Sequence, residues 1–156
     1  MSKKIINKSV KELIIFSDKN KKIYSNSKPY PHIVLKNFFN KNFLNEVLKE
    51  FPDLSKIKSS INYANKNEVK FANNDQKSFK KNTKILFQYL NSSQFVNFIH
   101  KTSSIKEKIL PDQTLSGGGL HEIKKGGVLK VHVDFNKHPT KNLDRRLNVL
   151  IYLNKN

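Results

Sequence analysis

The sequence predicts an α+β fold, with helices first and strands last. Between residues 40 and 112, apolar residues recur at the spacing of amphipathic helices. After that point they alternate with polar residues, and glycines separate the alternating segments. There are no internal repeats, and 156 residues suit one domain with a hydrophobic core. This change of hydrophobic period favours an α+β arrangement.

The N-terminal residues 1–28 are expected to form a weakly ordered basic arm. They are polar and lysine-rich apart from ELIIF, residues 12–16, which has room for one short strand or helix. The domain itself is expected over residues 29–156. In KPYPHIVLKNFF, residues 28–39, two prolines hold the chain extended, and HIVLKNFF has the composition of a strand.

The clearest helix is predicted to follow Asn40, which is a suitable N-cap. Its apolar positions are Phe43, Leu44, Val47, Leu48 and Phe51, and Pro52 ends the pattern. Residues 55–79 have few apolar anchors and predict a long loop. Residues 82–112 predict two or three short helices, with Ser93 as a candidate cap. Their apolar stripes are Leu86, Tyr89 and Leu90, followed by Phe95, Val96 and Ile99.

The C-terminal third predicts three strands. TLSGGGLHEI, residues 114–123, and VLKVHVDF, residues 128–135, are separated by KKGG, whose glycines suit a hairpin turn. A polar loop follows over residues 136–144. RRLNVLIYLN, residues 145–154, is then expected as the third strand.

Composition narrows the classes of partner. The net charge is +18, but only Arg145 and Arg146 are arginines, and the other 28 basic residues are scattered lysines. A nucleic-acid-binding face would set arginine forks and stacking aromatics beside the charge, so we do not expect a nucleic acid partner. The absence of cysteine excludes thiolate metal ligands. With no secretory signal and no apolar run near the roughly 20 residues of a membrane span, we expect a cytoplasmic protein without a membrane partner.

The segment LKVHVDFN, residues 129–136, holds the best candidates for chemistry. On a strand, His132 and Asp134 project from the same face and present an imidazole beside a carboxylate. Two histidines and one carboxylate on one face of an octahedron are typical of non-haem Fe(II) oxygenases. The spacing by itself leaves open an ordinary polar pair at a strand end. A cupin-like zinc or manganese site would use the same ligand types.

The surrounding sequence resembles a known family. GGGLHEIKKGGVLKVHVDFN, followed by LDRRLNVLIYLNKN, is similar to the Fe(II)- and 2-oxoglutarate-dependent dioxygenases of the prolyl 4-hydroxylase type. The resemblance covers about residues 29–156 and is most specific over 117–156. It implies the first strands of a double-stranded β-helix, a jelly-roll or cupin-like fold, with His132 and Asp134 as iron ligands.

The resemblance also implies a reaction and its partners. Fe(II) and 2-oxoglutarate would be the cofactors, with ascorbate as a candidate reductant. Decarboxylation of 2-oxoglutarate would be coupled, with O₂, to hydroxylation of a C–H bond. The substrate would be a protein, a peptide or a small molecule. The iron and the 2-oxoacid supply that chemistry, and the protein orients the substrate.

Four further residues are expected near this site. Tyr152 matches the family position whose hydroxyl reaches the distal carboxylate of 2-oxoglutarate; a half-buried strand tyrosine is the alternative. Asn148 and Leu150 share its strand face and are expected to line the same pocket, although core packing also explains Leu150. His121 is expected as a donor to a ligand or a substrate contact, or as an exposed cross-strand histidine. His138 is expected to be exposed to solvent on its loop, and His32 and His100 are expected to be structural or on the surface.

Part of the family's site has no counterpart here. The second iron histidine and the 2-oxoglutarate arginine come from strands downstream of Tyr-Leu-Asn, and Arg145 and Arg146 lie on the wrong strand for that arginine. We therefore expect a C-terminally incomplete fragment that binds Fe(II) weakly and lacks turnover by itself. The alternative is a non-catalytic basic module on a degenerate form of this fold, whose polyanion binding would depend steeply on salt.

Overall fold

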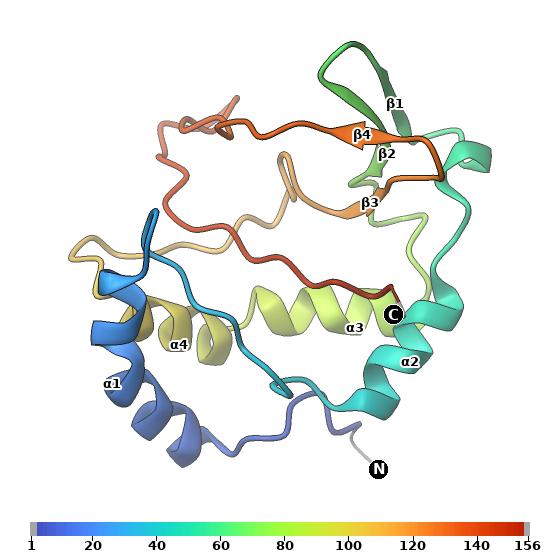
Figure 1. The fold of residues 1–156 in the computed structure, drawn as a ribbon. Helices are drawn as coiled ribbons and strands as arrows, with labels where there is room; N and C mark the ends of the chain where they lie inside the picture. Colours follow the sequence, from blue (N-terminus) through green and yellow to red (C-terminus); the bar gives the residue numbers. More distant parts are fainter. Residues whose placement is uncertain (1–2, 155–156) are drawn as a thin grey trace. The chain divides into compact units, whose positions relative to one another are not determined.

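The computed structural model describes residues 3–154 and shows the predicted α+β fold, four α-helices with a small open antiparallel sheet (Figure 1). The chain divides into two compact units. The first runs up to Glu50 and resumes over Lys81–Pro111. The second comprises Phe51–Lys80 and the chain from Asp112 onwards. The helices lie in the first unit and are α1 (Val10–Asn26), α2 (Lys41–Glu50), α3 (Lys81–Leu90) and α4 (Ser93–Ser103).

Helix α1 takes the place of the weakly ordered arm expected at the N-terminus. It begins with a capping box, in which Ser9 Oγ accepts from Glu12 N at 3.3 Å and Glu12 Oε2 accepts from Ser9 N at 2.6 Å. Its buried residues are Leu13 and Ser17. The Ser17 hydroxyl lies 2.8 Å from the Leu13 carbonyl and 3.5 Å from the Phe98 carbonyl of α4. The helix is therefore packed against α4 along a face that contains a serine.

The three later helices confirm the periodicity argument. Asn40 caps α2 through its Oδ1, which accepts from Phe43 N at 3.1 Å. The cap of α4 is Ser92 rather than Ser93, because the Ser92 hydroxyl accepts from the backbone N–H of Phe95. Among residues 3–154, no helix combines the length and the apolar character needed to cross a bilayer.

The strand expected over residues 32–39 is wrong. Only Phe39 pairs there, in an isolated bridge with Ile6. Asn37 has a φ of 53°, and this left-handed conformation interrupts the extended chain just before the bridge. The apolar residues of the segment pack into the helical unit instead. Leu35, Phe38 and Phe39 all belong to its core or lie against it.

An aromatic cluster forms the core of the helical unit. Its buried members are Ile6, Leu13, Phe38, Tyr89, Phe95 and Phe98. The rings of Phe38 and Phe98 stack with centroids 5.2 Å apart, and Phe95 meets Tyr89 at 5.5 Å. Aromatic pairs of this kind stabilise a core beyond the area that they bury. One cluster therefore joins α1, α3 and α4 to the segment before α2.

Tyr89 is the one polar member of this cluster. Tyr89 is only 9% exposed, and no polar atom of residues 3–154 makes a hydrogen bond to its hydroxyl. Burial raises the pKa of Tyr89 to about 12. The folded state therefore holds this proton more tightly than the unfolded state, where tyrosine titrates near pH 10. This difference in pKa stabilises the folded state fully below about pH 10, and that contribution to the free energy of unfolding is lost as the pH rises towards 12.

The variant Tyr89→Phe tests this arrangement. At neutral pH it should be neutral or up to about 1 kcal/mol more stable than the unmodified chain, because it removes an unsatisfied buried hydroxyl. Between pH 10 and 12 its advantage should grow by about 2 kcal/mol, because only the unmodified chain must ionise this tyrosine on unfolding. Urea unfolding at several pH values measures both effects, with the exposed Tyr30→Phe as control. Equal pH dependence of the two proteins would contradict the assignment.

The second unit contains a β-hairpin where a long loop was expected, so the loop prediction for residues 55–79 is wrong. Strands β1 (Ile61–Ala64) and β2 (Glu68–Asn73) pair antiparallel, with Ile61 opposite Ala72. The Asn65 side chain accepts from the backbone N–H of Glu68 at 3.1 Å and stabilises the turn. Most strand residues are at least partly exposed, and polar residues are interspersed among the apolar ones, which explains the weak sequence signal.

The hairpin expected around KKGG is also wrong. Strands β3 (Leu120–Glu122) and β4 (Val128–Leu129) do not pair with each other; both run antiparallel to β2, on the side away from β1 (Figure 1). Phe71 faces Glu122 and Val69 faces Val128. Residues 123–127 therefore bulge out of the strand at the one β2 residue between these two pairs, Lys70. A turn closed by Gly127 N and Lys124 O at 2.8 Å makes this excursion short. The two strands are thus halves of one edge strand, interrupted by a large irregular bulge.

The third strand predicted over residues 145–154 is not a regular strand in the described structure. The only pairing around it is an isolated bridge between Lys137 and Asp144. The sheet built from residues 3–154 accordingly stays open, with no closed barrel or jelly roll. Its edge next to β4 leads directly into the segment that carries His132 and Asp134.

Candidate metal centre

The segment after β4 presents its side chains alternately on two sides. Lys130 N donates to Asn67 O at 2.9 Å, which is the last backbone bond between this segment and the hairpin. Beyond it, Val131 and Val133 are fully exposed, whereas the side chains of His132 and Asp134 are about half exposed. This alternation is that of an extended chain. The strand predicted over residues 128–135 ends at Leu129, so that prediction is wrong beyond β4. The extended chain that follows nevertheless brings His132 and Asp134 together.

The two side chains meet through one atom each. His132 Nε2 lies 3.4 Å from Asp134 Oδ1. His132 Nδ1 lies 2.7 Å from the carbonyl oxygen of Lys130, and because a carbonyl only accepts, Nδ1 carries a proton. In the neutral ring, Nε2 then holds a lone pair that faces the carboxylate. Two facing electron-pair donors suit a shared cation, either a metal ion or a second proton on the imidazole.

The other carboxylate oxygen is already held. Asp134 Oδ2 accepts from Asn148 Nδ2 at 2.9 Å and lies 3.5 Å from Arg145 Nη2. Arg145 also donates to Asn148 Oδ1 at 3.1 Å and lies over the Phe135 ring, 4.7 Å from its centroid. These contacts leave Oδ1 available towards His132. An imidazole nitrogen and a carboxylate oxygen, each fixed through its second polar atom, are a donor set that fits a divalent first-row metal.

The structure supplies two donors at this point. Within residues 3–154, no group of three or more His, Asp or Glu side chains lies close enough to hold a metal ion. Asn148 donates to the carboxylate of Asp134, and its expected place in a cofactor pocket stays a prediction. Tyr152 and Leu150 are largely exposed, at 79% and 66%, so their role in binding 2-oxoglutarate stays a prediction.

His121 lies on β3 opposite Ala72, close enough to Asp134 for the charge of that carboxylate to affect its pKa. Loss of solvent around its ring and the charge of Lys70 lower the pKa of His121, while the charge of Asp134 acts in the opposite direction. Neighbouring residues cover part of the side chain, but His121 as a whole is exposed, so both the predicted substrate contact and the exposed cross-strand role are consistent with its position.

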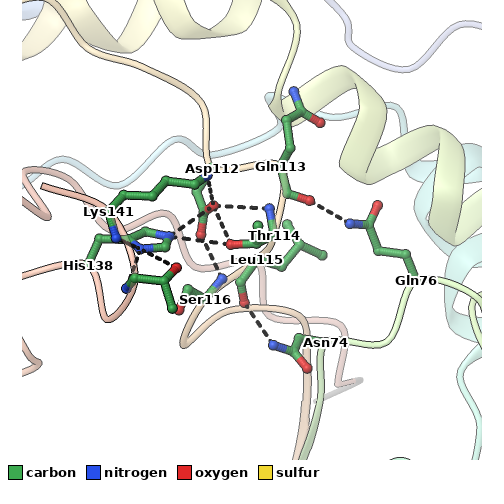
Figure 2. Close-up of polar contacts among 10 residues, drawn as sticks. Asn74, Gln76, Asp112, Gln113, Thr114, Leu115, Ser116, His138 and Lys141 are labelled. Carbon is green, nitrogen blue, oxygen red and sulfur yellow. Dashed lines mark hydrogen bonds and ion pairs between the residues drawn. The ribbon is translucent and has the colours of Figure 1, made fainter. Parts of the chain in front are cut away.

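His138 differs most from its expected role. It was expected at the surface of a polar loop, yet its side chain is only 10% exposed. Its Nε2 lies 3.4 Å from Asp112 Oδ1, and its Nδ1 accepts from the backbone N–H groups of Thr140 and Lys141, each at 3.2 Å (Figure 2). Both ring nitrogens are therefore engaged. No spacing in the sequence pairs this histidine with Asp112.

Asp112 is the centre of that network. Its Oδ1 accepts from Thr114 N at 3.0 Å and Thr114 Oγ1 at 2.6 Å, and its Oδ2 accepts from Ser116 N at 2.6 Å (Figure 2). Burial by itself raises the pKa of Asp112, but the hydrogen bonds from Thr114, Ser116 and His138 outweigh it and set the pKa at about 2. The group is thus a carboxylate throughout the neutral range.

Comparison with known proteins assigns no family: no family model, no curated protein and no solved structure matches this chain. The geometry of the His132–Asp134 pair and the residues that hold it are therefore the structural basis for a function. The pair offers one nitrogen and one oxygen to a cation, a short way beyond the end of β4.

Proposed function

We propose that this chain supplies two iron ligands, His132 and Asp134, of an Fe(II)- and 2-oxoglutarate-dependent dioxygenase of the prolyl-hydroxylase type. The observation that carries the proposal is the 3.4 Å approach of Nε2 to Oδ1, with the remaining polar atom of each side chain held elsewhere. Iron bound there with 2-oxoglutarate and O₂ would supply decarboxylation of the 2-oxoacid coupled to hydroxylation of a C–H bond.

The chain's own residues prepare the pair for a metal. The Lys130 carbonyl fixes the ring of His132 in the tautomer whose free lone pair is on Nε2. Asn148 and Arg145 neutralise and orient one oxygen of Asp134, so that the other faces the imidazole. The pair's exposure leaves room for the 2-oxoacid on the open side.

Further parts of the proposal rest on the sequence resemblance. Tyr152 is proposed to bind the distal carboxylate of 2-oxoglutarate, with Leu150 lining the same pocket and His121 near the substrate. The substrate class is a protein, a peptide or a small molecule. A cytoplasmic location likewise stays a prediction.

Metal titration of the 156-residue chain tests the pair. Under anaerobic conditions the chain should bind Fe(II) or Co(II) measurably, and His132→Ala and Asp134→Ala should each weaken binding at least tenfold, because each removes one of two donors. His32→Ala is the matched control. His32 also places Nδ1 against the carbonyl two residues earlier, at 2.9 Å from Tyr30 O, but within residues 3–154 it forms no ion pair with a carboxylate. This control should bind as the unmodified chain does.

Several results would count against the proposal. Metal binding that survives both substitutions would place the metal elsewhere. A strong preference for Zn(II), with no effect of 2-oxoglutarate on metal affinity, would favour the cupin-like reading. Tight, steeply salt-dependent binding of nucleic acid or heparin, together with no metal binding, would favour a basic binding module.

A further inference from the structure

The turn at residues 112–117 lies beside the loop that follows the metal pair. Two side chains of the second unit hold the turn at its backbone: Gln76 donates to Gln113 O at 2.7 Å, and Asn74 approaches Leu115 O at 3.5 Å (Figure 2). Both of these side chains follow directly after strand β2. The turn is therefore anchored to the end of the central strand.

His138 joins the loop to this turn, and its hydrogen bonds define its protonation. Backbone N–H groups of Thr140 and Lys141 point at Nδ1, so Nδ1 is an acceptor and the ring proton is on Nε2. That proton faces Asp112 Oδ1 and Thr114 Oγ1, each 3.4 Å from Nε2. Lys141 adds its ammonium group 3.7 Å from the same oxygen. The Asp112–His138 contact thus links a fixed turn to a loop.

Backbone hydrogen bonds within the loop connect His138 to the residues that hold Asp134. Across residues 136–145, His138 N donates to Leu143 O at 2.8 Å and Arg145 N donates to Asn136 O at 2.8 Å. These bonds fix Arg145 at the base of the loop, beside Phe135 and Asp134. From there Arg145 holds Asn148, and both hold Asp134 Oδ2.

The same turn also touches the pair's surroundings directly. A Cβ atom on Gly117 would collide with the Phe135 ring and lie 3.3 Å from Arg145 Nη1. The Phe135 ring that supports Arg145 therefore rests on the backbone of the turn. Asp112 at one end of the turn and Gly117 at the other both determine where the loop base lies.

We propose that Asp112 and His138 form a clasp that positions Asn148 and Arg145 on the carboxylate of Asp134. They are positioning residues, and their significance for metal binding rests on the function proposed above. The clasp itself is independent of any metal. It predicts that the hydrogen bond between Asn148 and Asp134 persists only while the His138 N–H reaches Asp112.

Two substitutions of His138 separate the two sides of its ring. His138→Gln keeps an N–H donor at the position of Nε2 and loses the acceptor, whereas His138→Asn keeps an acceptor at the position of Nδ1 and loses the donor. The first measurement is the ¹⁵N–¹H signal of the Asn148 side-chain amide in the metal-free 156-residue chain. It should stay in place in His138→Gln and move to the position of a solvated amide in His138→Asn.

The second measurement is Co(II) affinity, which should fall about tenfold in His138→Asn and change little in His138→Gln. Asp112→Ala, which removes the acceptor of the His138 N–H, should shift the Asn148 signal in the same direction as His138→Asn. An unchanged Asn148 signal in His138→Asn and Asp112→Ala, or equal damage in His138→Gln, would overturn the clasp. If the unmodified chain binds no metal but the Asn148 signal responds as described, the clasp stands and the proposed function fails.

Discussion

Replacing Gly119 with alanine is expected to destabilise the sheet unit by about 3 kcal/mol. Gly119 has a φ of 99°, and an added Cβ would collide with the carbonyl oxygen of Asn73 and approach Asn74 Cα to 2.9 Å. The obstructing atoms belong to the backbone of β2 and the residue after it, so they can move only if the pairing of Asn73 with Leu120 opens. The cost combines about 1–2 kcal/mol of backbone strain with about 1–3 kcal/mol of overpacking.

Gly126→Ala is the matched control for this prediction. Gly126 also has a positive φ, 83°, but an added Cβ there would meet no atom within 4 Å. Its substitution should cost about 1 kcal/mol, from backbone strain alone. Urea unfolding gives both values. Equal costs for the two variants would show that an added Cβ at Gly119 does not collide with the backbone of β2, which would contradict the prediction.

Replacing Phe95 with alanine is expected to cost the helical unit about 3–5 kcal/mol. Phe95 is almost fully buried and meets the rings of Tyr89, Phe98 and Phe38 at centroid distances of 5.5, 5.9 and 6.2 Å. Truncation would leave a cavity between α3 and α4 and remove three aromatic contacts. Such a loss is a large fraction of the 5–15 kcal/mol that stabilises an ordinary domain.

Phe95→Leu grades the effect, because leucine fills most of the same volume and should cost less than about 1.5 kcal/mol. Thermal unfolding followed by the circular dichroism of the helices measures both variants. A cost below 1 kcal/mol for Phe95→Ala would mean that the aromatic cluster can collapse around the missing ring or is less tightly packed than the structure shows.

The sequence predicted the helices whose buried faces are apolar and missed the one whose face is mixed. In α2, Phe43 and Val47 are buried at helical spacing, and the expected helix formed. In α1 the buried residues are Leu13 and Ser17, whereas Ile14 and Ile15 are exposed, so hydrophobic periodicity gave no signal. The pattern Ser-x-x-Glu at residues 9–12 is a capping-box signature that could have revealed it.

The strands of the sheet were also hard to predict, because their pairing depends on residues that are distant in the sequence. β2 pairs on both edges although much of it is polar, and its buried Asn73 is satisfied by Ser59 and Ser60 rather than by apolar packing. Such a strand is defined by its partners, and two of these, β3 and β4, lie far away in the sequence. The bulge at KKGG also depends on the register with β2, and from sequence alone it is indistinguishable from a hairpin turn.

At the candidate metal centre, the spacing of His132 and Asp134 was enough to place them on one side of the chain. Local sequence also brought Asn148 into consideration, although its partner proved to be the Asp134 carboxylate. The roles of Asp112 and His138 could not be predicted, because their contact depends on how the turn and the loop fold together within the second unit.

The most direct test of the metal centre is the map of amide signals that Mn(II) broadens in the ¹⁵N-labelled 156-residue chain. Small additions of Mn(II) should first broaden the amides of residues 131–135 and 145–148, and this effect should disappear in the double variant His132→Ala, Asp134→Ala. Broadening that begins elsewhere, or that is unchanged in the double variant, would contradict the assignment of these two residues as metal ligands.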